Sequence, residues 1–128
     1  MRALKILIVD DSAMMRALIK RAVKLTDLDI GELYEAENGR RALDVLDTRQ
    51  VDAVLTDINM PEMNGVELLR EIVRRGVTDL VKVVVSTDGS AARRDEVRDL
   101  GVTAYIDKPF APEIIRDVLI QCHPSVVR

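Results

Sequence analysis

LKILIVDDS at residues 4–12 is an apolar, β-branched run that stops at two aspartates and a serine. Its length and composition are typical of a buried strand in a parallel sheet. Four similar runs follow, at residues 33–36, 51–56, 80–86 and 103–106. Segments with the helical spacing of apolar residues separate these runs. The alternation predicts an α/β fold, a doubly wound five-stranded parallel sheet with helices between the strands.

The helical segments carry recognisable start and stop signals. Ser12 and Asn38 are suitable N-caps, the third helix is expected over about 65–75 with Gly76 as its left-handed cap, the fourth starts near Ser90, and Pro112 lies in the first turn of the fifth. The residues expected to face the core include Leu18, Val73 and Ile114. The first helix also has a basic face, which we interpret as a solvated stripe in preference to a docking surface for an acidic kinase; it comprises Arg16, Lys20, Arg21 and Lys24.

Length and charge limit the possible classes of protein. We expect one domain over residues 1–122 and a C-terminal tail over 123–128. Lys+Arg 19 against Asp+Glu 22 gives a net charge of -3, which argues against direct binding of nucleic acid. A single cysteine excludes an internal disulfide, and no apolar stretch approaches the roughly 20 residues of a membrane span. We therefore expect a cytoplasmic protein without membrane insertion.

Polar residues follow the predicted strands at the edge where open parallel sheets bind their ligands. Asp10 and Asp11 follow the first strand, Asp57 follows the third, Ser86 ends the fourth, and Lys108 comes just after the fifth. Three carboxylates in one place repel each other unless a divalent cation lies among them. A set of oxygen ligands favours Mg²⁺.

Five separated motifs carry a resemblance to a known family. They are Asp10-Asp11, Thr56-Asp57-Ile58-Asn59-Met60-Pro61, Ser86, Tyr105 and Lys108-Pro109-Phe110. In this order they resemble the receiver domain of two-component response regulators, and within it the chemotaxis, or CheY, type. The resemblance extends over about residues 5–121 and implies the flavodoxin-like strand order 2-1-3-4-5.

The resemblance implies a role for each residue of the acidic edge. Asp57 would be the phosphoacceptor, taking a phosphoryl group from a histidine kinase. Mg²⁺ would be bound by Asp11, Asp57 and the backbone carbonyl of Asn59, with Asp10 acting through a water molecule. Ser86 and Lys108 would contact the phosphoryl group, and the Lys108-Pro109 bond would be cis.

The resemblance also implies a conformational switch. Ser86 would move toward the phosphoryl group and Tyr105 would turn inward, which changes the face formed by the fourth helix, fifth strand and fifth helix. That face would bind a protein target such as the flagellar motor switch, and the resemblance admits a dedicated phosphatase as a further partner. The protein would catalyse only its own phosphorylation and dephosphorylation, and we do not expect it to be an enzyme acting on other substrates.

Thr87 departs from the family pattern, which usually has a small residue after the switch serine. Asn59, Thr87 and Asp88 would flank the route of water to the phosphoryl group. A stiff, β-branched Thr87 would hinder that water. The alternative is that the Thr87 hydroxyl only caps the turn at Asp88-Gly89.

Other functions remain as alternatives. The chain could be the N-terminal receiver of a regulator with a DNA-binding output domain, although its end six residues past the last helix favours a stand-alone switch. A phosphatase of the haloacid dehalogenase type also uses an aspartate nucleophile, Mg²⁺ and a lysine. Its nucleophile lies in a DxD motif, whereas Asp10 and Asp11 are adjacent. A glycine-rich nucleotide site is excluded because no two of the six glycines lie close enough together.

Overall fold

The computed structural model describes residues 3–122, so the predicted tail at 123–128 lies outside the described residues. Within this range five strands alternate with five helices. The strands are β1 (Leu4–Val9), β2 (Ile30–Ala36), β3 (Ala53–Thr56), β4 (Val81–Ser86) and β5 (Ala104–Asp107). The helices are α1 (Ala13–Lys24), α2 (Gly39–Thr48), α3 (Gly65–Arg74), α4 (Ala91–Arg98) and α5 (Pro112–Cys122).

The strands form one parallel sheet in the order β2-β1-β3-β4-β5, as predicted. Val9, the last residue of β1, is level with Thr56 at the end of β3. Thr56 is in turn level with Val84 of β4. Strand β4 therefore extends two residues beyond the end of β3, to Ser86, and Ser86 pairs with Asp107 of β5. This register brings the carboxyl ends of all the central strands to one edge of the sheet.

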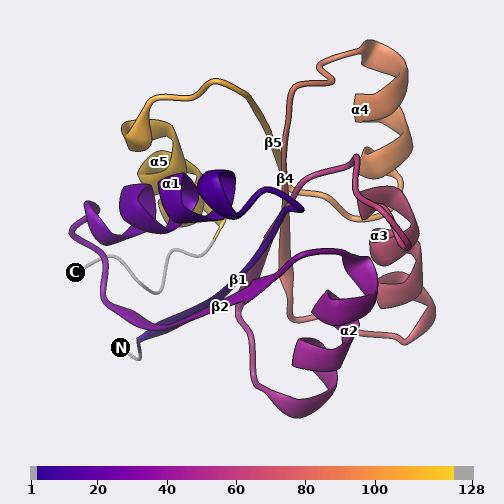
Figure 1. Cartoon of the computed structure of the whole chain (residues 1–128), viewed down its shortest axis with the longest axis horizontal. Helices are drawn as coiled ribbons and strands as arrows, with labels where there is room; N and C mark the ends of the chain where they lie inside the picture. The colour runs from indigo at the N-terminus through magenta and orange to yellow at the C-terminus, as the bar shows by residue number, and fades with distance from the viewer. Residues whose placement is uncertain (1–2, 123–128) are drawn as a thin grey trace.

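Helices cover both faces of the sheet (Figure 1), with α1 and α5 on one side and α2, α3 and α4 on the other. Alternate residues of β1 serve the two faces because side chains along a strand point to opposite sides. Ile6 and Ile8 pack with α1 and α5, while Leu7 and Val9 pack with α2 and α3. None of the helices within residues 3–122 is long and apolar enough to cross a membrane.

Side chains cap the helices at the same edge of the sheet. Ser12 and Asn38 are N-caps, as predicted, and each accepts a hydrogen bond from the backbone N–H three residues later. Ser90 caps α4 in the same way. A capping box formed by Asn64 and Glu67 begins α3 and was not predicted. Gly76, with φ 74°, follows α3 in the left-handed conformation expected of it.

Three apolar residues predicted to face the core are instead partly open. Leu18 is 50% exposed, Val73 47% and Ile114 42%. Each lies at the border of its helix's apolar stripe, where periodicity cannot distinguish a covered position from an open one. Strand β2 also begins earlier than predicted, at Ile30, because this edge strand is half exposed and its apolar run is interrupted.

Candidate functional site

Three aspartates meet at the carboxyl edge of the sheet, as the motif positions predicted. Asp10 is buried, Asp57 is half-buried and Asp11 is exposed, and one carboxylate oxygen of each lies within 4.8 Å of the others. Backbone hydrogen bonds extend the sheet by one residue here: the N–H of Asp57 donates to the Val9 carbonyl (2.9 Å), and that of Asp10 to the Ala36 carbonyl (3.1 Å). The sheet itself therefore positions the two carboxylates.

Backbone amides and one lysine orient these carboxylates. Oδ1 of Asp10 accepts from the N–H of Ser12 (2.9 Å), and Oδ1 of Asp57 accepts from the N–H of Ile58 (2.7 Å). The other oxygen of each faces the Lys108 ammonium, with Nζ 2.8 Å from Oδ2 of Asp10 and 3.2 Å from Oδ2 of Asp57. Lys108 thus joins the two carboxylates through the oxygens that the backbone leaves free.

The side chain of Lys108 is only 9% exposed. Burial opposes its charge, but hydrogen bonds and attraction from Asp10 and Asp57 outweigh that effect, so the pKa of Lys108 is raised above its usual value. Its backbone N–H donates to the Ser86 carbonyl (2.9 Å), which fixes the lysine beside β4. The Lys108-Pro109 peptide bond is cis, as the resemblance implied.

The donor set suits a hard divalent cation. Asp10, Asp11 and Asp57 contribute three carboxylates against the one ammonium of Lys108, which leaves a formal charge of about -2 that one divalent ion would neutralise. The three carboxylate oxygens are the ligand type that Mg²⁺ prefers. Asn59 lies exposed in the loop after β3, two residues past Asp57.

The residues from Ser86 to Gly89 form a turn at the end of β4, at the same edge of the sheet as the acidic pocket. The buried Ser86 hydroxyl accepts a hydrogen bond from the N–H of Asp88 (3.1 Å). Thr87 is exposed, and within residues 3–122 its hydroxyl forms no hydrogen bond. Ser86, and not Thr87, therefore holds the turn at Asp88-Gly89, so the capping alternative for Thr87 was wrong.

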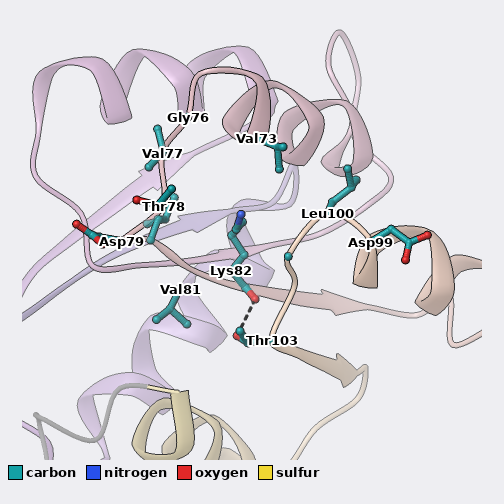
Figure 2. Close-up of a pocket in the computed structure, with 12 residues that line it drawn as sticks. Val73, Gly76, Val77, Thr78, Asp79, Val81, Lys82, Asp99, Leu100 and Thr103 are labelled. Atoms are coloured by element: carbon teal, nitrogen blue, oxygen red, sulfur yellow. Dashed lines mark hydrogen bonds between the residues drawn. The ribbon is translucent and has the colours of Figure 1, made fainter.

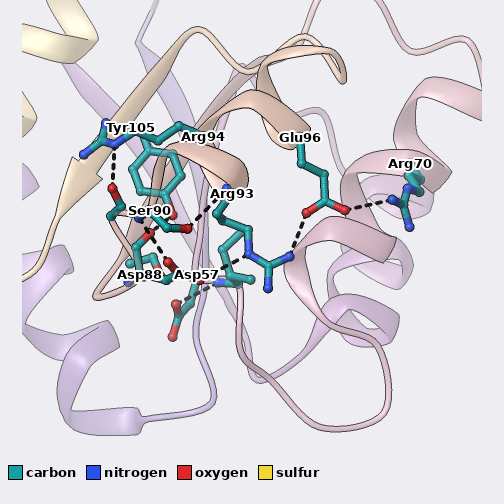
Figure 3. Close-up of polar contacts among 11 residues, drawn as sticks. Asp57, Arg70, Asp88, Ser90, Arg93, Arg94, Glu96 and Tyr105 are labelled. Atoms are coloured by element: carbon teal, nitrogen blue, oxygen red, sulfur yellow. Dashed lines mark hydrogen bonds and ion pairs between the residues drawn. The ribbon is translucent and has the colours of Figure 1, made fainter.

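Asp88 is engaged with the start of α4. Hydrogen bonds from Ser90, together with Arg93, hold the pKa of Asp88 below its usual range. Figure 3 shows the polar chain that continues from Asp88 to Arg93 (3.3 Å), then to Glu96 (2.7 Å) and on to Arg70 of α3 (3.0 Å). The carboxylate of Asp88 is thus tied to α4 and, through it, to α3.

Tyr105 is half-buried and points toward the same turn (Figure 3), where its hydroxyl donates to the Asp88 carbonyl. Burial raises the pKa of this phenol. The Arg94 guanidinium lies over the ring at 4.4 Å from its centre and binds both carboxylate oxygens of Asp107 (2.6 and 2.7 Å). We call these contacts of Arg94 with Tyr105 and Asp107 the Arg94 clasp. The sequence did not predict it, because it forms only when α4 packs beside β5.

The basic face of α1 is only partly solvated. Nη1 of Arg16 donates to the Asp10 carbonyl (2.6 Å), and its Nε donates to Glu35 of β2 (3.0 Å). Lys20 pairs with the same glutamate at 2.7 Å, and its hydrogen bond contributes most to lowering the pKa of Glu35. The interpretation as a plain solvated stripe was therefore wrong for Arg16 and Lys20, which tie α1 to the end of β1 and to β2.

The sequence and the fold of this chain are similar to those of known proteins. Residues 6–120 match the family model of the response regulator receiver domain. A chemotaxis protein CheY homolog of Campylobacter jejuni is 39% identical over 118 residues, which cover 91% of this chain and 89% of that protein. Chemotaxis protein CheY1 of Helicobacter pylori is 36% identical over 91% of this chain and 94% of its own length. The structure of chemotaxis response regulator CheY4 of Vibrio cholerae is similar to this fold with a TM-score of 0.80 and 27% identity, covering 94% of this chain and 99% of that one.

Proposed function

This chain belongs to the response regulator receiver family, and from that premise we propose that it is a stand-alone, chemotaxis-type switch phosphorylated by a histidine kinase on Asp57. One observation carries the choice of acceptor: the Lys108 ammonium contacts Oδ2 of Asp57, the carboxylate that is neither buried like Asp10 nor exposed like Asp11. Membership in the family also favours this function over the haloacid dehalogenase alternative.

The geometry supports a specific nucleophile. Oδ1 of Asp57 is occupied by the Ile58 amide, so Oδ2 is the oxygen free to attack phosphorus. The new O–P bond forms as the P–N bond of the phosphohistidine donor breaks, and the imidazole leaves with a proton. Lys108 can then shift its contact from Oδ2 to a phosphoryl oxygen, and Ser86 would hydrogen-bond another.

A divalent cation completes the proposed site. Asp11, Asp57 and the carbonyl of Asn59 would hold Mg²⁺, with Asp10 acting through an intervening water. When bound, the ion offsets negative charge on the transferring phosphoryl group. We propose that the protein catalyses its own phosphorylation and dephosphorylation and no other reaction.

A second part of the proposal is the switch. The Ser86 hydroxyl holds the Asp88 N–H, and the Asp88 carbonyl holds the Tyr105 hydroxyl. A phosphoryl group that draws Ser86 away therefore loosens the turn that anchors the Tyr105 ring. The ring in turn supports Arg94 on the α4-β5-α5 face, where we propose that a target protein such as the flagellar motor switch binds. The acidic charge and single cysteine of the chain support a cytoplasmic setting.

Substitution of the acceptor tests the function. We expect Asp57→Asn to abolish labelling by a small acyl-phosphate donor, since an amide is a poor nucleophile and removes a metal-binding charge. Asp47→Asn is the matched control and should label normally, because Asp47 lies in the last turn of α2 and pairs with Arg75 at the end of α3. Full labelling of the Asp57→Asn variant, or of wild type in excess EDTA, would rule out the assignment.

Amide chemical shifts test the switch. On addition of beryllofluoride and Mg²⁺, shifts should occur around Asp57 and also on α4, β5 and α5, because Ser86 and Tyr105 connect these regions. A Ser86→Ala variant should keep the shifts around Asp57 and lose most of those on the α4-β5-α5 face. Shifts confined to the acidic pocket of wild type would contradict the coupling.

A further inference from the structure

A second lysine is buried at the opposite edge of the sheet. Lys82 lies in β4, its residue is 8% exposed, and its side chain is on the face that α3 and α4 cover. Across residues 3–122 no hydrogen bond or ion pair to its ammonium group is found. Lysine is almost never this buried without a partner. Either a ligand that pairs with the ammonium or a feature of the fold that stabilises its charge must therefore explain the burial of Lys82.

Lys82 projects into a pocket of about 650 Å³ between the carboxyl-terminal ends of α3 and α4 (Figure 2). Val73, Val77 and Leu100 supply apolar walls, and Asp79 and Asp99 are exposed members of the lining. Among the described residues every side-chain nitrogen or oxygen that is shut off from solvent has a partner. The unpartnered ammonium is therefore open to the pocket. The volume is in the range of small-molecule sites.

The end of α4 lies close to the Lys82 ammonium. Both α3 and α4 finish at a left-handed glycine, Gly76 with φ 74° and Gly101 with φ 83°. A Cβ added to Gly101 would lie 3.0 Å from Nζ of Lys82, so the ammonium is close to the end of α4. Helix carboxyl ends attract cations. Burial lowers the pKa of Lys82.

We propose that this pocket binds a small organic monocarboxylate, whose charged group pairs with Lys82 and whose hydrocarbon part packs on Val73, Val77 and Leu100. A carboxylate supplies the hydrogen-bond acceptors that the ammonium lacks. The hydrocarbon part accounts for the apolar walls. Asp79, Asp99 and the two helix ends repel further negative charge, so the site selects a monoanion over phosphate. This site is separate from the phosphoryl chemistry of Asp57.

The test is a titration of the isotope-labelled full chain with sodium hexanoate, followed through the backbone amides of residues 80–83 and 97–103. We expect saturable shifts of these amides. Hexan-1-ol has the same hydrocarbon chain without the charge, and it should bind at least about tenfold more weakly. Inorganic phosphate should leave these amides unshifted.

Two variants and a control complete the test. Lys82→Met keeps the length of the side chain and should weaken hexanoate binding at least about tenfold. Val77→Asp adds a negative charge to the lining without touching the lysine and should also weaken binding. Lys24→Met, an exposed lysine of α1, should bind as wild type does. Unshifted amides elsewhere in each variant show that the fold is intact.

Three results would overturn the proposal. Absence of saturable hexanoate shifts would mean that Lys82 serves only the ends of α3 and α4. If the Lys82→Met variant bound hexanoate as tightly as wild type does, or if hexan-1-ol bound as tightly as hexanoate, the site would be only an apolar groove. Binding of phosphate as tight as that of hexanoate would contradict the selection for a single charge.

Discussion

Lys108 and Lys82 both have largely buried side chains, at opposite edges of one sheet: 9% of the Lys108 side chain and 8% of the whole Lys82 residue are exposed. Two carboxylates contact Lys108, and its pKa is raised. Lys82 has no carboxylate partner within residues 3–122, and its pKa is lowered. The carboxylate partners of Lys108 therefore account for the opposite directions in which the two pKa values shift.

The difference follows from the direction of the strands. At the carboxyl edge, strand ends deliver Asp10, Asp57 and Lys108 into one space, and helices begin there with capped N-termini. At the amino edge, the ends of α3 and α4 line the pocket around Lys82, and within residues 3–122 no side-chain anion contacts its ammonium. The first arrangement suits chemistry on a charged group, whereas the second leaves a cation available to an external anion.

The largest effect should come from removing the partnered lysine. We expect Lys108→Met to slow labelling of Asp57 by a small acyl-phosphate donor on the order of 100-fold, because no ammonium remains to offset charge on the phosphoryl group. Initial labelling rates at fixed Mg²⁺ measure this effect. Lys82→Met is the matched control and should label at the wild-type rate. If both variants lost labelling equally, the conclusion that only Lys108 acts on the phosphoryl group would be wrong.

The unpartnered lysine should have the opposite effect on stability. We expect Lys82→Met to raise the free energy of unfolding by about 1 kcal/mol, because it replaces a poorly compensated charge with an apolar side chain of similar length. Urea denaturation at neutral pH measures the difference. A less stable variant would show that the helix ends compensate the ammonium fully.

The pH dependence of that difference identifies its cause. An unfolded lysine has a pKa near 10.5, whereas folded Lys82 has a lower one, so the unfolded chain binds more protons between these two values. Wild-type stability should therefore rise relative to the variant across that interval, and the advantage of Lys82→Met should be complete below it and vanish above pH 10.5. A difference independent of pH would point to packing and not to charge.

The smallest effect should come from substitution of Thr87, because it changes the shape of the site around Asp57 without altering the charges there. We expect Thr87→Ala to speed spontaneous dephosphorylation, and phosphorylation by small donors, by about threefold, because the β-branched side chain narrows the approach to phosphorus. Decay of labelled protein after donor removal measures the first rate. Equal or slower loss of label from the variant would show that Thr87 does not hinder water.

The apolar runs were sufficient to predict five strands and the acidic edge, because strand ends can be located from such runs and Asp10, Asp57 and Lys108 follow them directly. The order of the strands came from the family resemblance. The buried position of Lys82 was not predicted. Lys82 interrupts an apolar, strand-like run, and nothing in the sequence indicates which helices cover it. Its lack of a partner depends on where α3 and α4 end in space. The Arg94 clasp on Tyr105 likewise depends on packing between α4 and β5, which residue spacing does not reveal.

The distance along the chain between the acidic residues and Lys108 has a consequence for a protein still being made. Lys108 follows Asp57 by 51 residues and Asp10 by 98. At ribosomal speeds Asp57 precedes it by roughly 3 to 10 s. During that interval the nascent chain holds the aspartates but neither the ammonium nor the edge strand β5. Under the proposed function, a nascent chain that ends before Lys108 would take up phosphate inefficiently, so phosphorylation would begin only after β5 and Lys108 have been made.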